Sequence, residues 1–142
     1  MLIYPKTIVL FTLLHTGFSP YGQVIKKQPQ ELLALRDKNH PFSLTKSLFE
    51  KDSAYFIMFR NDKYDAIVDW QHISLDTYRL EKFYNALLMI PTLKPDENID
   101  LGDVNITTEK ANVVFYTEGG WAALTRKQVE QLAGVIKREL KK

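Results

Sequence analysis

The first 23 residues constrain this chain more than any other segment, because they have the order of a secretory signal peptide. One basic residue, Lys6, precedes an apolar run from Thr7 to Leu14, and a polar stretch rich in Gly, Ser and Pro follows. The run is far shorter than the roughly 20 residues that a membrane-spanning helix needs. We therefore expect a signal peptide at residues 1–22 and a mature protein that is periplasmic or secreted and has no stable membrane anchor.

A second interpretation of the same segment stays open, in which Thr7 to Leu14 forms a buried strand or a core helix of a cytosolic protein. The cleavage site does not decide between them, because Gly22 suits the last position before the cut whereas Pro20 lies two residues before it. A lipoprotein signal is excluded, since that class needs a cysteine at the cut and the chain has none.

The remaining residues, 23–142, are enough for a single domain with one hydrophobic core. No disulfide can support the fold without cysteine, so the 45% of hydrophobic residues must supply its stability. The formal net charge of +2 is too small to indicate nucleic acid or a membrane surface as a partner. Composition therefore favours an ordinary globular domain.

The N-terminal half of this domain predicts two short helices and a β-hairpin. Pro29 is well placed to open a helix that carries three leucines, and Ser43 to cap a second helical turn that ends near Phe49. Apolar residues at every position from Ala54 to Phe59 predict a strand that is buried on both faces. After a polar turn, the alternation from Tyr64 to Trp70 predicts its antiparallel partner.

The C-terminal half predicts a helix, three strands and a final helix. Asp76 or Ser74 can cap the first helix, which Pro91 ends. Short alternating runs at 104–107, 112–117 and 121–124 predict three strands of a meander. The last helix opens with a capping box of Thr125 and Gln128. Each helix has an apolar stripe at helical spacing: Leu80, Phe83, Tyr84, Leu87 and Leu88 in one, and Val129, Leu132, Ala133, Ile136 and Leu140 in the other.

The order of these elements predicts an α+β fold. We expect one antiparallel sheet of about five strands, made of the hairpin and the three-strand meander. The two amphipathic helices are expected on one face of this sheet, with the short N-terminal helices beside them. The opposite face of the sheet is then left without a predicted cover.

No motif in the sequence carries catalysis or metal binding. The G-x-S-x-G, phosphate-loop and zinc-protease patterns are all missing, so no cofactor or metal is expected. His72 follows Asp69 by three residues, but residues three apart on a strand point to opposite faces and cannot form an acid–base pair. The acidic loop from Asp96 to Asp103 lacks the spacing of an EF-hand and is expected to be solvated.

The aromatic residues, 12% of the chain, supply the best functional hypothesis. An uncovered sheet face that carries several aromatic side chains is a contact surface. We therefore expect binding residues at Trp70, Tyr116, Gly119, Gly120 and Trp121, where two glycines expose backbone beside an indole. The competing interpretation is that the glycines form a tight turn, the indole joins the core and the N-terminal helix covers the sheet.

These observations favour a small exported protein that binds a protein partner, or a second copy of itself, without catalysis. The rival hypothesis is an extracytoplasmic hydrolase with a carboxylate pair such as Asp65 or Asp69 with Glu118. The size of the chain also suits a periplasmic inhibitor or immunity protein, or a purely structural component. RNA binding is disfavoured because Lys and Arg do not flank the aromatic strands.

Overall fold

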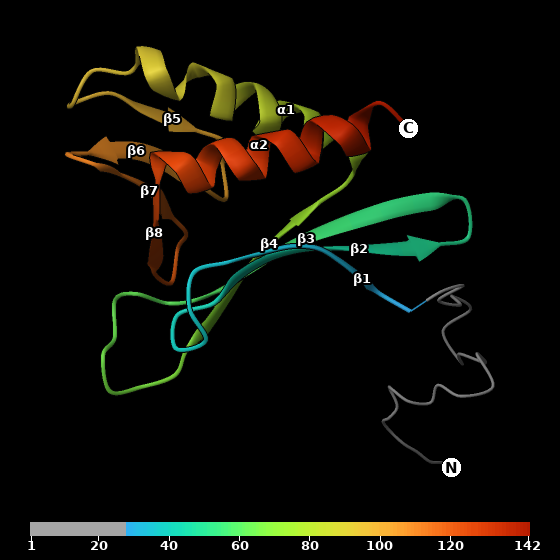
Figure 1. Ribbon diagram of the computed structural model, residues 1–142, viewed down its shortest axis with the longest axis horizontal. Helices are drawn as coiled ribbons and strands as arrows, with labels where there is room; N and C mark the ends of the chain where they lie inside the picture. Colours follow the sequence, from blue (N-terminus) through green and yellow to red (C-terminus); the bar gives the residue numbers. More distant parts are fainter. Residues whose placement is uncertain (1–27) are drawn as a thin grey trace.

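The computed structural model of the protein describes residues 28–142. The expected signal peptide, residues 1–22, lies outside these residues, and so export stays a prediction. The described chain forms two antiparallel four-stranded sheets, and a helix follows the last strand of each (Figure 1).

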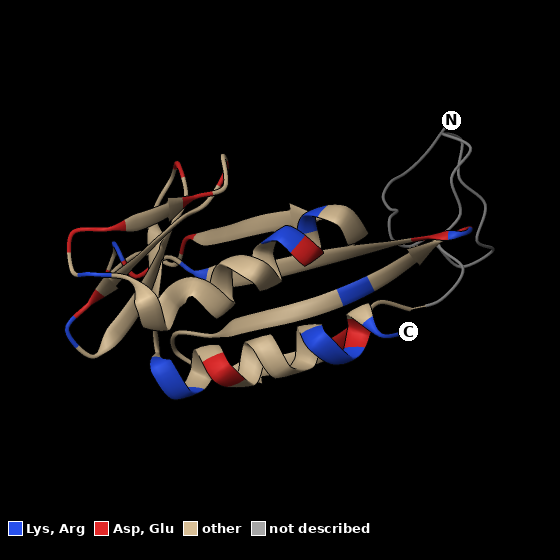
Figure 2. Ribbon diagram, turned by 90° about the horizontal axis from the view of Figure 1, so that it is seen from above, with Lys and Arg blue, Asp and Glu red and all other residues tan. Residues whose placement is uncertain are grey.

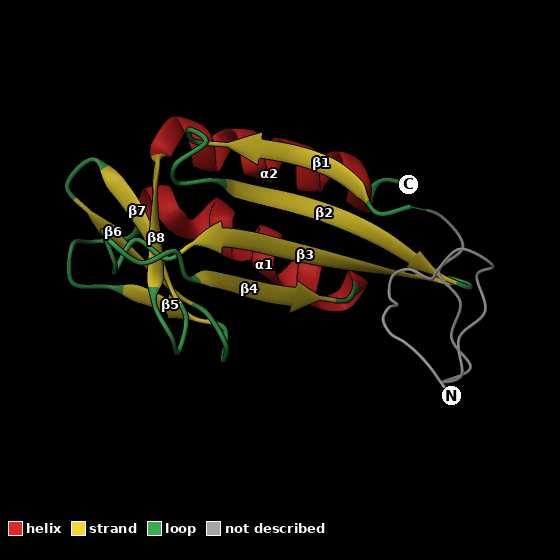
Figure 3. Cartoon of the chain, turned by 90° about the horizontal axis from the view of Figure 1, so that it is seen from below, coloured by secondary structure: helices red, strands yellow, loops and turns green. Residues whose placement is uncertain are grey.

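The first sheet has the strand order β1-β2-β3-β4. Its strands are β1 Gln30–Leu35, β2 Phe42–Phe49, β3 Asp52–Arg60 and β4 Trp70–Leu75. Figure 3 views this sheet with both helices behind it. We call the face toward the helices the inner face and the opposite face the outer face.

The two expected N-terminal helices are wrong, because these segments are strands β1 and β2. In β2, Phe42 and Leu44 are buried on the inner face while Ser43 and Thr45 lie on the outer face, which is the period of a strand. In β1 the register shifts between Glu31 and Leu33, and this bulge disguises the alternation of its leucines.

The expected hairpin is correct in its first strand and wrong in its second. Strand β3 covers the apolar run, but its partner β4 begins at Trp70, where the predicted strand ends. Residues 61–69 form a loop instead, closed at its base by a hydrogen bond of 2.7 Å from the Asn61 N–H to the Asp69 carbonyl. Within β4, Ile73 and Leu75 are buried, whereas His72 and Ser74 are exposed.

Helix α1, Thr77–Met89, confirms the first predicted helix. The Asp76 side chain caps it by accepting a hydrogen bond of 2.7 Å from the Arg79 N–H. A 3₁₀ turn that contains Pro91, Ile90–Thr92, follows the helix. Four side chains of α1 are buried: Leu80, Phe83, Ala86 and Leu87.

The second sheet contains the predicted meander and one further strand. Its strands are β5 Asn98–Asp100, β6 Asn105–Glu109, β7 Asn112–Tyr116 and β8 Trp121–Thr125. The short β5 lies in a segment expected to be a loop. Helix α2, Arg126–Leu140, begins at the predicted capping box, in which Thr125 and Gln128 each accept a backbone hydrogen bond.

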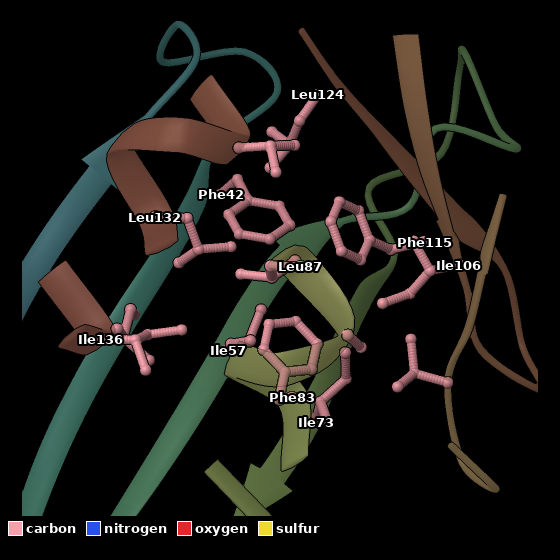
Figure 4. Packing of buried hydrophobic residues seen from close by; sticks show 14 of the residues in the cluster. Phe42, Ile57, Ile73, Phe83, Leu87, Ile106, Phe115, Leu124, Leu132 and Ile136 are labelled. Atoms are coloured by element: carbon pink, nitrogen blue, oxygen red, sulfur yellow. The ribbon is translucent and has the colours of Figure 1, made fainter. Parts of the chain in front are cut away.

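The expected single five-stranded sheet is therefore wrong, although the α+β class is correct. The hairpin and the meander belong to separate sheets, and each gains strands that the sequence analysis did not assign. Aromatic rings join the two sheets in one core: Phe115 of β7 lies 5.9 Å from Phe42 of β2 and 6.0 Å from Phe83 of α1, measured between ring centroids (Figure 4). The second sheet thus packs against the end of the first layer rather than extending it.

Both helices are amphipathic and lie side by side over the inner face (Figure 1). Figure 2 shows Lys and Arg interspersed with Asp and Glu along both helices. Neither helix of residues 28–142 is long and apolar enough to cross a membrane.

Candidate functional site

Exposed large hydrophobic side chains gather around β4. Four of the seven that the described chain exposes are Met58, Ile67, Val68 and Trp70, and we call these four residues the β4 patch. Ile67 and Val68 lie in the loop before β4 and are each 61% exposed, and Trp70, the first residue of β4, is 50% exposed. The other three, Tyr78, Leu88 and Met89, lie on helix α1.

The register of the first sheet places Trp70 and Met58 on its outer face. Met58 pairs with His72 of β4, and Trp70 pairs with Arg60 of β3. Their neighbours Phe59 and Ile73 are buried on the inner face, so the alternation of the strands directs Met58 and Trp70 outward. Among the described strands β4 pairs only with β3, so its other edge is free of strand pairing, and at the end of this edge the Arg79 side chain donates to the Ser74 carbonyl at 3.0 Å.

The loop that carries Ile67 and Val68 is anchored by the fully buried Asn61. The Asn61 Nδ2 donates hydrogen bonds to the Asp69 carboxylate at 2.9 Å and to the Gly119 carbonyl at 3.0 Å. Its Oδ1 accepts from the backbone N–H groups of Lys63 and Trp121, both at 3.0 Å. All four hydrogen-bonding positions of this amide are used, so its role is to hold the loop in place.

The next residue, Asp62, joins the loop to strand β8. Its N–H donates to the Trp121 carbonyl at 2.8 Å, and its carboxylate accepts from the Ala123 N–H at 2.9 Å. The guanidinium of Arg36, the residue after β1, donates to the same carboxylate at 2.6 Å. This ion pair is largely buried and connects the two sheets. The loop thus covers the edge of β8.

The contacts of the loop 61–69 and of Gln71 with strand β8 and the turn before it form what we call the joint. The two glycines that were expected to admit a ligand, Gly119 and Gly120, lie in this joint. A Cβ on Gly120 would be 2.0 Å from the Asn61 side chain, and one on Gly119 would be 2.9 Å from Gln71. Neither glycine has a positive φ. Close packing by the buried Asn61 side chain, rather than backbone conformation, therefore requires glycine at position 120, whereas at position 119 the added Cβ would meet only the end of the flexible Gln71 side chain.

Asp69 has the environment of a structural carboxylate. Hydrogen bonds from the side chains of Asn61 and Gln71, each 2.9 Å long, lower the pKa of the Asp69 carboxyl. A general acid of a hydrolase needs a raised pKa. Gln71 also accepts a hydrogen bond from the Thr117 hydroxyl, so that Asp69 is part of the joint between β4 and the second sheet.

Tyr116 and Trp121 form a separate aromatic pair on the second sheet. Their ring centroids lie 6.5 Å apart at an interplanar angle of 48°. The Tyr116 hydroxyl donates to the Glu109 carboxylate at 3.0 Å. Burial, and then the hydrogen bond with Glu109, raise the pKa of the Tyr116 phenol. The five expected binding residues thus fall into three places: Trp70 in the β4 patch, the two glycines in the joint, and the Tyr116–Trp121 pair.

A buried charge cluster was not foreseen from the sequence. Glu139 of α2 is buried, and its carboxylate accepts from Lys46 at 2.9 Å and from Lys142 at 2.6 Å. The Tyr55 hydroxyl lies 3.4 Å from the same carboxylate. The sequence contains one signal for this cluster: Glu139 lies within the apolar stripe of a predicted helix. A carboxylate buried at such a position needs partners of opposite charge. The cluster attaches the end of α2 to the first sheet.

The described residues contain no group of three acidic or histidine side chains that would hold a metal ion. Comparison of the sequence with protein-family models and with curated proteins finds no match. The β4 patch and the Tyr116–Trp121 pair are therefore the two candidate binding sites of the described residues.

Proposed function

We propose that this protein is a small exported binding module that recognises another protein chain through the β4 patch and the free edge of β4. The observation that carries the proposal is the concentration of exposed apolar side chains at Met58, Ile67, Val68 and Trp70. Exposed apolar side chains concentrated in one region mark interaction sites, and tryptophan is enriched among the residues that dominate binding energy.

The unpaired edge of β4 supports binding by strand addition. The other edges are protected: β1 carries a bulge, β5 has three residues, and the Asp62 loop covers β8. Strand β4 has six residues without Pro, Lys or a bulge, and its outward side chains are Trp70, His72 and Ser74. An extended segment of a partner would pair with this edge and place alternate side chains against the patch.

Substitution in the patch tests the proposal. Trp70→Ala and Ile67→Asp should each weaken capture of a partner from the native host at least about tenfold, since a central anchor residue contributes on the order of 2 kcal/mol. Leu88→Ala removes a similarly exposed apolar side chain from α1 and should leave capture unchanged. Equal capture by all three variants, at unchanged stability, would contradict the proposal.

Export is the second part of this proposal and is supported by the order of residues 1–22, a basic residue followed by an apolar run and a polar end. The chain needs no disulfide to fold, as it has no cysteine. The intact mass of the protein recovered from its host measures this part separately. We expect the mass of residues 23–142, and the mass of the full chain would contradict export.

A further inference from the structure

In the second sheet we call the face that points away from the hydrophobic core the outer face. This face carries a row of four side chains across its strands. Asp100 of β5 pairs with Asn105 of β6, Asn105 with Tyr116 of β7, and Tyr116 with Trp121 of β8. Directly paired residues point to the same face of a sheet. The neighbouring Phe115 is fully buried in the core, so the row faces away from it.

The Tyr116 ring of this row lies along the surface of its own sheet. Val114 is buried but is not part of the main hydrophobic core, which agrees with its place on the outer face. The hydroxyl of Tyr116 reaches Glu109 at the other end of the β6–β7 pair, so the ring extends along the sheet in the direction of Val114. Tyr116 and Trp121 are themselves half-buried, so neither residue is enclosed in the core.

Two acidic residues lie near this aromatic pair. Asp100 is two strands from Tyr116, and its carboxylate accepts a hydrogen bond of 2.9 Å from the Gly102 N–H. Asp100 lies in the same row and the exposed Glu118 lies in the turn between β7 and β8. The basic residues next to these strands, Lys110 in the β6–β7 turn and Arg126 and Lys127 at the start of α2, follow the opposite ends of the strands. Two further basic side chains are engaged elsewhere: Arg36 pairs with Asp62, and Lys63 lies over the Tyr64 ring.

We propose that the Tyr116–Trp121 pair binds an organic cation, an ammonium or guanidinium group, with Asp100 and Glu118 supplying the opposite charge. Aromatic faces attract such cations through the negative charge of the ring face, and tryptophan does so most strongly. The Tyr116 hydroxyl donates a hydrogen bond to the Glu109 carboxylate, which increases electron density on the ring. Phosphate-bearing ligands are repelled by the same carboxylates. This site is separate from the β4 patch.

The chain has two tryptophans, so each can be studied alone. In the Trp70→Phe variant the fluorescence of Trp121 reports on the site, and in the Trp121→Phe variant Trp70 serves as the control. Choline is the probe, and 3,3-dimethylbutan-1-ol is its neutral counterpart of the same shape. We expect a saturable response to choline in the first variant, at least about fivefold tighter than to the alcohol, and none in the second.

Three further variants test the chemistry of the site. In the Trp70→Phe background, Tyr116→Ala should abolish the response and Asp100→Asn should weaken it, whereas Asp96→Asn, a charge removed from the preceding loop, should not. Pentalysine distinguishes two sources of the cation. If the ligand is a lysine side chain of a partner protein, pentalysine should bind more tightly than choline, and if it is a free amine, pentalysine should not. Cellohexaose, a neutral oligosaccharide, tests whether the two rings stack on a sugar instead. Equal affinity for choline and the alcohol, a response to cellohexaose alone, or no response to any probe would overturn the proposal.

Discussion

At the scale of single residues, Asn61 contributes most to the arrangement of the candidate surface. Its buried amide satisfies four partners and fixes the loop that presents Ile67 and Val68. Gly120 provides the space for this amide, since any side chain there would overlap it. The two glycines could be singled out from the sequence, but their contact with Asn61 could not, because it joins residues about 60 positions apart.

Gly120→Ala should therefore destabilise the protein by about 2–4 kcal/mol, because its Cβ would displace Asn61 and leave buried polar groups unpaired. Gly134→Ala is the matched control. Gly134 lies in α2 and its added Cβ would meet only the end of the flexible Arg138 side chain, 3.9 Å away. That substitution should stabilise the helix by roughly 0.5–1 kcal/mol.

Urea denaturation measures both changes in the free energy of unfolding. A loss at position 120 that is no larger than about 0.5 kcal/mol would show that the joint tolerates a side chain, and the role assigned to Asn61 would be wrong.

At the scale of elements, sequence patterns identified both helices and three strands of the second sheet, because caps and periodicity are local signals. The strands β1 and β2 were mistaken for helices for two local reasons. The bulge at Glu31 to Leu33 breaks the alternation in β1, and Leu44, Leu48 and Phe49 also fit a helical spacing in β2. That Met58 and Trp70 lie on the same face of the sheet can be recognised only once the β3–β4 register is known.

The attachment of α2 to the first sheet should depend on pH through Glu139. Burial opposes its ionisation, but hydrogen bonds from Lys142 and Lys46 outweigh this, and the pKa of Glu139 is lowered. The hydrogen bond with Glu139 likewise raises the pKa of Lys46. The carboxylate therefore contributes stability above its unfolded pKa, near 4.5, that is lost as pH falls through the lower folded value. Lys46 contributes below its unfolded pKa, near 10.5, and this is lost as pH rises through the higher folded value.

Glu139→Gln should accordingly destabilise the protein by about 1–3 kcal/mol at pH 7, since it leaves the Lys46 ammonium without its carboxylate. The difference from the unsubstituted protein should shrink when unfolding is measured at acid pH. Glu130→Gln, at an exposed position of the same helix, is the control and should change little. A difference for Glu139→Gln that does not vary with pH would refute the ion pair as its cause.

At the scale of the whole molecule, the partition into two sheets was not predictable from the sequence. Local alternation shows that a segment is a strand but not which sheet it joins, and the packing of Phe115 between Phe42 and Phe83 is a long-range contact. The division into two sheets matters for function because it creates a corner between them. There the loop from Asn61 to Asp69 covers one edge and leaves the edge of β4 free.

The central claim is that a partner protein binds at the β4 patch. A photo-cross-linking amino acid at Val68, compared with one at Leu88 on α1, tests it most directly in the native host. We predict a discrete cross-linked species from position 68 only, heavier than the chain by the mass of a partner, and its loss when Trp70→Ala is added. Cross-links of equal yield from both positions, or none from position 68, would contradict the claim.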